Sequence, residues 1–163
     1  MLYDSFSGLV MGVCLRYAKN PDEAEDIFQE AFIKIFENLN QVSTPEALPG
    51  WIRRLTINTA LDELKVKKFH WLVPNEINDL DDNQYSDLLD HLTNEQIIKI
   101  INELPEGYRA VFNLNIIDGY SHREIGKKLG ITESTSRSQL TYAKRLLQQR
   151  LKKLGITRYE SVI

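Results

Sequence analysis

A glycine that separates two helical patterns constrains this chain more than any other feature of its sequence. Ser121 and Glu124 have the spacing of a capping box, which places the start of a helix at Ser121. Gly130 follows that short helix, and glycine readily adopts the left-handed conformation that ends a helix. Thr132 can then cap a longer helix that continues to Leu151. The segment is therefore predicted to form a helix-turn-helix.

The longer helix of this pair has an apolar side and a polar side. Its apolar side contains four residues at helical spacing: Leu140, Ala143, Leu147 and Leu151. Hydroxyl, aromatic and guanidinium groups lie opposite that side or on its flanks: Ser134, Thr135, Arg137, Ser138, Thr141, Tyr142 and Arg145. Such groups can contact base edges and phosphates in a DNA major groove, although an ordinary solvated helix face has a similar composition. The preceding turn and the basic charge of the segment favour DNA binding.

The net charge of −3 conceals an uneven distribution along the chain. Residues 1–39 have three basic and seven acidic side chains, whereas residues 51–70 have five basic and two acidic ones. Residues 71–92 have six acidic side chains and no basic one, and residues 93–163 have twelve basic and seven acidic ones. Two basic segments are therefore separated by an acidic segment, and the acidic average does not exclude nucleic-acid binding.

Composition limits the broad class of the protein. Hydrophobic residues make up 42% of the 163 residues, which is enough to bury a core. Cys14 is the single cysteine, so no internal disulfide can form, and this fits a reducing compartment. The sequence contains no secretory signal and no apolar run of about 18 residues. We therefore expect a soluble, cytoplasmic protein.

Helical periodicity also runs through the first part of the chain. One helix is predicted over residues 1–19, and Asn20 and Pro21 predict the start of a second helix that ends near Leu39. The expected core side of the second helix comprises Ala24, Ile27, Phe28, Ala31, Ile35 and Leu39. The opposite side comprises Asp26, Gln29, Glu30, Glu37 and one apolar residue, Ile33. Ile33 is either an isolated exposed hydrophobe or the anchor of a helix-docking surface.

A loop and a basic helix follow. Two prolines and a glycine predict a loop over Asn40–Gly50, and a third helix is expected from about Trp51 to Phe69. Its basic residues include Arg53, Arg54, Lys65, Lys67 and Lys68. Asn58, Asp62 and Lys65 lie between two apolar sides of this helix. Polar residues in such positions are more often hydrogen-bonded core groups than the lining of a site.

The second half of the chain completes an all-α pattern. Thr93 and Gln96 predict a helix cap before a helix over Ile97–Leu104, and the next helix begins at Pro105, has Val111, Phe112, Leu114 and Ile117 as its core and ends at Gly119. No segment shows β-alternation. The predicted fold is therefore two small helical domains, the second containing the helix-turn-helix, joined by a flexible acidic linker. The expected boundaries are residues 1–70 for the first domain, 71–92 for the linker and 93–158 for the second domain.

These segments together resemble the extracytoplasmic-function group of bacterial RNA polymerase sigma factors, whose two helical domains are called region two and region four. The segments PDEAEDIFQEAFIKIF and WIRRLTINTALDELK resemble region two. The segment LPEGYRAVFNLNIIDGYSHREIGKKLGITESTSRSQLTYAKRLL resembles region four. The resemblance covers nearly the whole chain outside the linker and the tail. It implies an alternative sigma factor that binds the polymerase core and directs promoter-specific transcription initiation.

The resemblance also implies roles for individual residues. Binding of the polymerase clamp helices is implied for Asp26, Gln29, Glu30 and Ile33. Recognition and melting of the −10 promoter element is implied for Arg53, Arg54, Asn58, Asp62 and Lys65, and the Asn40–Gly50 loop matches the family's grip on the unpaired strand. Recognition of the −35 element as duplex is implied for Ser134, Thr135, Arg137, Ser138, Thr141, Tyr142 and Arg145.

Five positions depart from the family pattern. Gly126 and Thr56 replace the usual alanine, Ser136 replaces a common valine, Gln139 replaces a common arginine and Lys65 replaces the usual arginine. Gln139 can hydrogen-bond to adenine where arginine prefers guanine. These changes are compatible with the same fold and bear on the promoter sequence.

The implied partners are the RNA polymerase core, through its β′ clamp helices and β flap, promoter DNA, and an anti-sigma factor, which in this family is often membrane-bound. No cofactor or metal is expected, because the dispersed His70, His91 and His122 do not have the spacing of a metal site. His122, at a helix start, contacts either phosphate or solvent. One alternative is a stand-alone helix-turn-helix repressor or activator that binds a palindrome without polymerase. A helical enzyme is disfavoured, because no catalytic constellation and no phosphate-binding glycine loop is present.

Overall fold

The computed structural model describes residues 1–66 and 92–155, and of Lys65 and Val66 it describes the backbone alone. Over these two ranges the regular structure is helical, without strands, which confirms the all-α fold class. The chain divides into two compact units, Met1–Phe69 and His70–Ile163, here called unit one and unit two. The predicted acidic linker lies outside the described residues except for Leu92. In the part of the chain that is described, no helix is long and apolar enough to cross a membrane.

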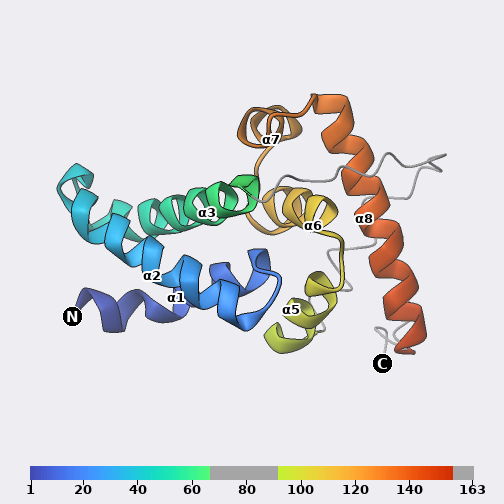
Figure 1. The fold of residues 1–163 in the computed structure, drawn as a ribbon, viewed down its shortest axis with the longest axis horizontal. Helices are drawn as coiled ribbons and strands as arrows, with labels where there is room; N and C mark the ends of the chain where they lie inside the picture. Colours follow the sequence, from blue (N-terminus) through green and yellow to red (C-terminus); the bar gives the residue numbers. More distant parts are fainter. Residues whose placement is uncertain (67–91, 156–163) are drawn as a thin grey trace. The chain divides into compact units, whose positions relative to one another are not determined.

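Unit one is a bundle of three helices in mutual contact, drawn in blue to green in Figure 1. They are α1 (Leu2–Tyr17), α2 (Pro21–Asn38) and α3 (Leu48–Val66), with the short 3-10 turns η1 (Leu39–Gln41) and η2 (Pro45–Ala47) between α2 and α3. The predicted start of α2 is confirmed, because the Asn20 side chain accepts a hydrogen bond from the Glu23 N–H at 2.8 Å. Proline at the first helical position lacks only an N–H that would have no partner within the helix.

The core of unit one is formed by apolar side chains from all three helices. Its members include Val10, Val13, Tyr17, Ala24, Ile27, Ala31, Ile35, Ile52, Ile57 and Leu61. Each buried Val, Leu or Ile side chain stabilises the fold by roughly 1.5–3 kcal/mol relative to an exposed one. Two threonines on α3 are also buried, and each satisfies its hydroxyl locally. Thr56 Oγ1 donates to the Ile52 carbonyl at 2.8 Å, and Thr59 Oγ1 donates to the Leu55 carbonyl at 2.9 Å.

Two predictions for unit one are wrong in detail. Leu39 was expected in the core but is 37% exposed, because α2 ends at Asn38 and the 3-10 turn changes the direction of the next side chains. Phe32 is buried instead, with its ring 4.7 Å from that of Tyr3. The third helix begins at Leu48 rather than at Trp51, because Pro49 is tolerated in the first turn of a helix.

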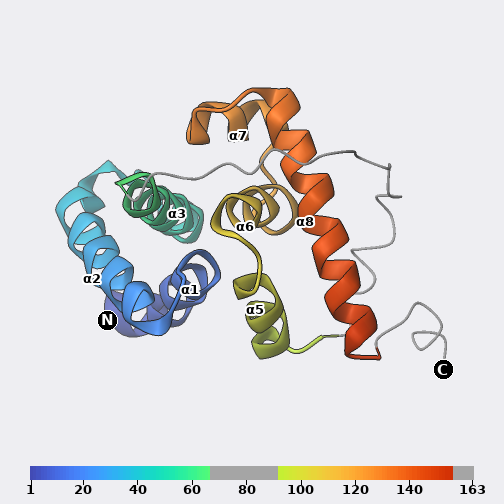
Figure 2. The same ribbon diagram turned by 45° about the vertical axis from the view of Figure 1, so that its right-hand side comes forward.

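Within residues 92–155, the described part of unit two, the structure has four α-helices and one π-helical turn. They are α5 (Asn94–Asn102), α6 (Glu106–Phe112), the π-helical turn η3 (Asn113–Ile117), α7 (His122–Leu129) and α8 (Glu133–Lys153). Figures 1 and 2 show α8 as one long helix, with α7 near its beginning, α6 along its middle and α5 near its end. The predicted cap of α5 is confirmed, because Thr93 and Gln96 form a complete capping box.

The core of unit two surrounds α6 and the inner side of α8. It includes Ile101, Val111, Phe112, Leu114, Ile125, Leu140, Ala143, Leu147 and Leu151, so the predicted apolar side of the last helix is confirmed. Ile117 was expected in this core but is only half-buried, and Asn113 is fully buried. The reason is the π-helical turn, in which the Asp118 N–H bonds to the Asn113 carbonyl at 2.9 Å. This i→i+5 bond shifts the following side chains out of the α-helical register.

The burial of Cys14 makes a prediction about its reactivity. Its side chain is fully buried, and burial raises the pKa of the thiol to about 12. Because the thiolate is the reactive form, the folded protein should not react with iodoacetamide at about pH 8, whereas the denatured protein should be modified fully. Intact mass measures both states, and Cys14 is the single cysteine. Modification of the folded protein at the rate of a free thiol would contradict this burial.

Candidate nucleic-acid interface

The helix-turn-helix of unit two has the local contacts that its sequence predicts. Ser121 Oγ accepts a hydrogen bond from the Glu124 N–H at 3.2 Å, and Glu124 Oε2 accepts one from the Ser121 N–H at 2.7 Å. Gly130 ends α7 with a φ of 68°, in the left-handed region. Thr132 Oγ1 then accepts a hydrogen bond from the Thr135 N–H at 3.0 Å and caps α8. The predicted helix-turn-helix is confirmed.

The capping box also changes the acidity of Glu124. Hydrogen bonds from the backbone N–H of Ser121, and then from its side chain, hold the pKa of the Glu124 carboxyl below its ordinary value. A lowered pKa in the folded state means that the ionised carboxylate stabilises the fold at neutral pH. This stabilisation is lost as the pH falls through the folded-state pKa of Glu124.

The turn approaches α7 most closely at Gly126, which is buried. The Ile131 N–H donates a hydrogen bond to the Gly126 carbonyl at 3.0 Å. A Cβ atom added to Gly126 would lie only 2.7 Å from the Ile131 carbonyl oxygen and 3.6 Å from the Glu133 nitrogen. The atom in the way belongs to the backbone, which cannot rotate aside as a long side chain can. Glycine at this position therefore permits the close approach.

A side-chain hydrogen bond joins the beginnings of the two helices. His122, the first residue of α7, has its Nδ1 atom 2.8 Å from Ser136 Oγ on the first turn of α8. Ser136 is fully buried and His122 is half-buried. His122 therefore has a partner within the protein, which the sequence interpretation of a phosphate or solvent contact did not include. Sequence reasoning missed this bond because the two residues are 14 positions apart and meet only after the turn is formed.

Seven predicted DNA-contacting residues share the outer side of α8 between Ser134 and Arg145. Ser134 and Arg137 are exposed, and the other five are half-buried: Thr135, Ser138, Thr141, Tyr142 and Arg145. Arg137 forms an ion pair with Glu133 one turn earlier, and its side chain remains 59% exposed. The Tyr142 ring packs against the Tyr108 ring at 4.9 Å between centroids, so this ring also supports the fold. The side that results is polar, basic and accessible to a large ligand.

Gln139 does not belong to this side, contrary to the sequence interpretation. It is 2% exposed and lies among the residues that face the core, so it cannot reach a base edge without rotation of the helix. Lys144 and Arg109 are also buried, at 4% and 3% exposure, and the sequence had not marked them as buried. Charged residues are seldom buried without partners, so residue type gives no reason to place Arg109 of α6 or Lys144 of α8 in the core.

Unit one contains an open hollow of about 340 Å³ between η1, the end of α2 and the outer side of α3. It is lined by Lys34, Gln41, Trp51, Arg54, Leu55, Asn58, Thr59 and Asp62. Asn58 and Asp62 are exposed, so the interpretation of these residues as core groups is wrong and their interpretation as the lining of a site fits. A cavity with an indole ring, amides and cations can hold an unstacked base and its phosphates.

Not every predicted residue of unit one meets at this hollow. Arg53 is exposed but does not line it, and the side chain of Lys65 lies outside the described residues. Lys34 and Trp51 line it although the sequence did not mark them, and Gln41 belongs to the Asn40–Gly50 loop that the family resemblance implies for the unpaired strand. Lys34 is on α2 and Gln41 is in the turn η1, and no periodicity within α3 relates them to Asn58. Among residues 1–66 and 92–155, no cluster of three potential metal ligands is present.

The outer side of α2 is acidic with two exposed apolar residues. Asp26 and Gln29 are exposed, and Glu30 pairs with Lys34 at 3.5 Å. Ile33 is 53% exposed, in agreement with its predicted position, and Phe36 is 55% exposed. Sequence reasoning missed Phe36, although its spacing of three from Ile33 indicates a shared side of the helix.

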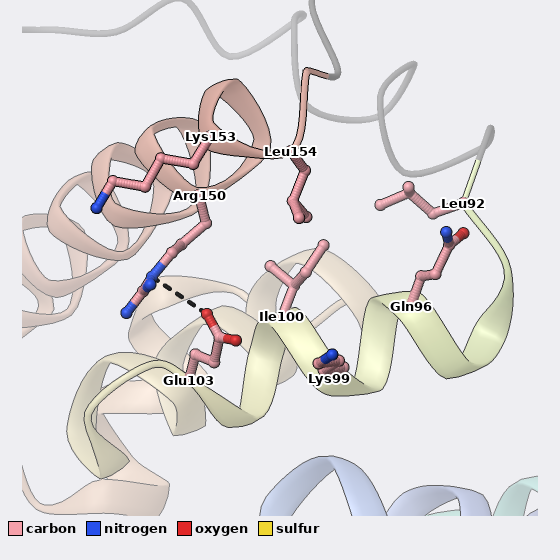
Figure 3. A pocket seen from close by; sticks show the side chains of 8 residues that line it. All are labelled: Leu92, Gln96, Lys99, Ile100, Glu103, Arg150, Lys153 and Leu154. Carbon is pink, nitrogen blue, oxygen red and sulfur yellow. Dashed lines mark ion pairs between the residues drawn. The ribbon is translucent and has the colours of Figure 1, made fainter.

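A second hollow, of about 250 Å³, is in unit two, near the end of α8 and away from Ser134 and Arg137 at its beginning. It lies between α5 and the end of α8, where Leu92, Ile100 and Leu154 point toward one another (Figure 3). Glu103 closes one side through an ion pair with Arg150, whose Nε lies 3.1 Å from Glu103 Oε2. The combination of apolar lining and basic rim fits a protein segment better than DNA.

A helical bundle followed in the same chain by a helix-turn-helix unit defines a class of helical DNA-binding proteins. Residues 2–69 match the family model for sigma-70 region 2, and residues 94–147 match the model for sigma-70 region 4. The chain belongs to the sigma-70 family of RNA polymerase sigma factors, in its extracytoplasmic-function (ECF) group, and acts as an alternative sigma factor in transcription initiation.

Individual relatives agree with this assignment. The ECF RNA polymerase sigma factor SigW of Bacillus subtilis is 27% identical over 94% of this chain and 88% of its own length. The ECF RNA polymerase sigma factor SigL of Mycobacterium tuberculosis is 28% identical over 96% of this chain and 90% of its own length. The sigma factor RpoE of Bartonella quintana, solved in complex with the anti-sigma factor NepR, superposes with a TM-score of 0.56. It is 18% identical over 92% of this chain and 94% of that chain, which shows a shared fold.

The close approach at Gly126 predicts the effect of adding one methyl group. Alanine favours a helix over glycine by about 1 kcal/mol, but forcing an atom into a packed contact costs typically 1–3 kcal/mol. Because the clash is with backbone, we expect Gly126→Ala to lower the free energy of unfolding by about 1 kcal/mol, as measured by urea denaturation. The matched control is Gly8→Ala, at a helical position with open space around the added atom. A Gly126→Ala protein more stable than wild type would contradict the predicted clash.

Proposed function

We propose that unit one docks on RNA polymerase core and holds the unpaired −10 element, while unit two holds the −35 element as duplex. One observation supports this proposal above the others: the two units present two different surfaces for nucleic acid. Unit one has a hollow sized for a single base, and unit two has an exposed polar helix side suited to a groove. We assign residues 1–70 to region two, residues 93–158 to region four and residues 71–92 to the acidic linker between them.

The hollow of unit one has the groups that an extruded base requires. A stacked base pair hides its Watson–Crick edge, so a protein can contact that edge only after the base leaves the stack. Trp51 offers an aromatic ring for stacking, and the Asn58 amide and the Asp62 carboxylate offer donors and acceptors for the base edge. Lys34 and Arg54 supply positive charge for the flanking phosphates. Asp62 repels phosphate, so its role is to accept hydrogen bonds from a base amino group.

The outer side of α8 suits the major groove of duplex DNA. Arg137 can form two hydrogen bonds with guanine, and such a contact discriminates against other bases by about 1–3 kcal/mol. Its ion pair with Glu133 is exposed, and pairs of this kind contribute about 0.5 kcal/mol or less. The guanine contact is therefore the stronger one, and Arg137 can exchange Glu133 for DNA. Ser134, Ser138 and Thr141 add hydroxyl groups that contact bases or phosphates.

The outer side of α2 is the proposed contact with the polymerase clamp helices. Asp26, Gln29 and Glu30 provide acceptors around the exposed Ile33, which provides an apolar anchor. The hollow at the end of α8 is the proposed contact with the β flap, because Ile100 and Leu154 give it an apolar lining. Its lining residue Arg150 lies about 20 Å along the helix axis from Arg137, so both partners can bind together.

The remaining elements of the proposal follow from these contacts. A factor that acts by positioning polymerase on DNA carries out no catalytic step and needs no cofactor. Its place of action is the cytoplasm, where polymerase and promoter DNA are found. An anti-sigma partner is expected, because the Bartonella relative was solved in complex with one. Such a partner would compete with polymerase for the outer side of α2.

The function is tested by binding the protein to bacterial core RNA polymerase and transcribing a promoter library. We expect a stable holoenzyme with selective initiation. Ile33→Glu places a charge in the apolar anchor and should weaken core binding about tenfold or more, since anchors of interfaces contribute about 2 kcal/mol or more. Ser5→Glu is the control, because it adds the same charge at an exposed position of α1. Duplex DNA binding without core binding would instead support a stand-alone repressor or activator.

Arg137→Ala tests the proposed −35 contact separately. We expect promoter binding by the holoenzyme to weaken about fivefold to a hundredfold, as for the loss of one bidentate base contact, with core binding unchanged. Lys152→Ala is the matched control, because it removes one positive charge from the exposed end of α8 about 20 Å away along the helix. Both affinities are measured by fluorescence anisotropy on the selected promoter at saturating core. Equal affinity of the Arg137→Ala and Lys152→Ala holoenzymes would remove Arg137 from the interface.

A further inference from the structure

Two departures from the family pattern meet in the contact between α7 and α8. Ser136 stands where the family often has valine, and its hydroxyl forms the 2.8 Å hydrogen bond with His122 Nδ1. Gly126 stands where the family usually has alanine, and it permits the close approach of the Ile131 carbonyl. His122 and Gly126 are four residues apart on α7, so both lie on the side of that helix that faces the turn.

Ser136 is placed among the residues proposed to contact DNA without being one of them. Its side chain is fully buried, and its sequence neighbours Thr135 and Arg137 are on the proposed −35 contact side of α8. A bond to Ser136 therefore fixes the first turn of α8, both in its rotation about the helix axis and in its position along that axis. This turn carries those side chains. Because a serine hydroxyl can donate or accept, the bond persists with either tautomer of His122. Valine at this position cannot form it.

We infer that His122 and Ser136 are positioning residues, whose hydrogen bond sets the angle at which α8 meets the −35 duplex and thereby its choice of sequence. This inference rests on the proposed function, since it assigns these residues a role in that same recognition. Neither residue needs to touch DNA. The bond acts through Thr135, Arg137 and Ser138, whose reach into the groove changes with the angle between α7 and α8.

A direct phosphate contact by His122 is the competing explanation, and a double-mutant cycle separates the two. The wild-type holoenzyme first selects promoters from a library with a randomised −35 element, and the selected promoter becomes the probe. Holoenzymes of Ser136→Ala, His122→Ala and the double variant are then compared for affinity and for discrimination among −35 sequences. Circular dichroism establishes that every variant is folded at the temperature used. His122→Asn is the rescue variant, because asparagine carries a hydrogen-bonding atom at the position of Nδ1.

We expect each single variant to lose about fivefold in affinity for the selected promoter, which is the effect of one hydrogen bond on an equilibrium constant. Its preference among −35 sequences should broaden, and its core binding should be unchanged. The double variant should lose no more than either single variant, because both remove the same bond. His122→Asn should restore the wild-type preference. Losses that add in the double variant, with a lower salt dependence for His122→Ala, would overturn the inference in favour of a phosphate contact.

Arg137→Ala distinguishes failure of the inference from failure of the proposed function. If Arg137→Ala weakens promoter binding while Ser136→Ala and His122→Ala keep the wild-type affinity and preference, the positioning role is wrong and the recognition surface stands. If Arg137→Ala also has no effect, the −35 assignment of α8 itself is wrong, and the positioning role is overturned with it.

Discussion

The contact between Gly126 and the Ile131 peptide is the constraint on which unit two depends. The turn passes close to α7 at this point, and a Cβ atom on residue 126 would lie 2.7 Å from the Ile131 carbonyl oxygen. The left-handed Gly130 ends α7 one residue before Ile131, and Thr132 restarts the helix one residue after it. Gly126, Gly130 and Thr132 thus each suit the backbone geometry needed at their position, and together they set the direction of α8.

Unit one depends on packing between whole helices rather than on contacts within one turn. Its three helices bury one side each, and the outer side of α3 is left open beside the end of α2 and the turn that follows it. A hollow forms there because Asn58 and Asp62 point away from the core, whereas Thr56 and Thr59 on the same helix satisfy their hydroxyls within it. The polar residues of α3 therefore differ in their surroundings: Thr56 lies in the core, Asn58 and Asp62 are exposed at the hollow, and the buried Thr59 also lines it.

Local sequence signals predicted helix starts and ends correctly where the contacts that form them span four residues or fewer. The capping boxes at Thr93 and Ser121, the asparagine cap of α2 and the glycine end of α7 all depend on atoms within one turn. Predictions at the flanks of helices were less accurate. Gln139 was placed on the polar side of α8 and is buried, because the direction of the core depends on where α6 and α7 pack against that helix.

The sequence alone determined the helical class, the helix-turn-helix, the separation of charge along the chain and the identity of most candidate contact residues. These properties follow from residue type and from spacing within one helix, which the chain carries before it folds. Tertiary structure decided that Lys34 and Gln41 join Asn58 at one hollow, and that His122 bonds to Ser136 across 14 residues. It did so because such meetings depend on the packing of whole helices, which no local pattern specifies.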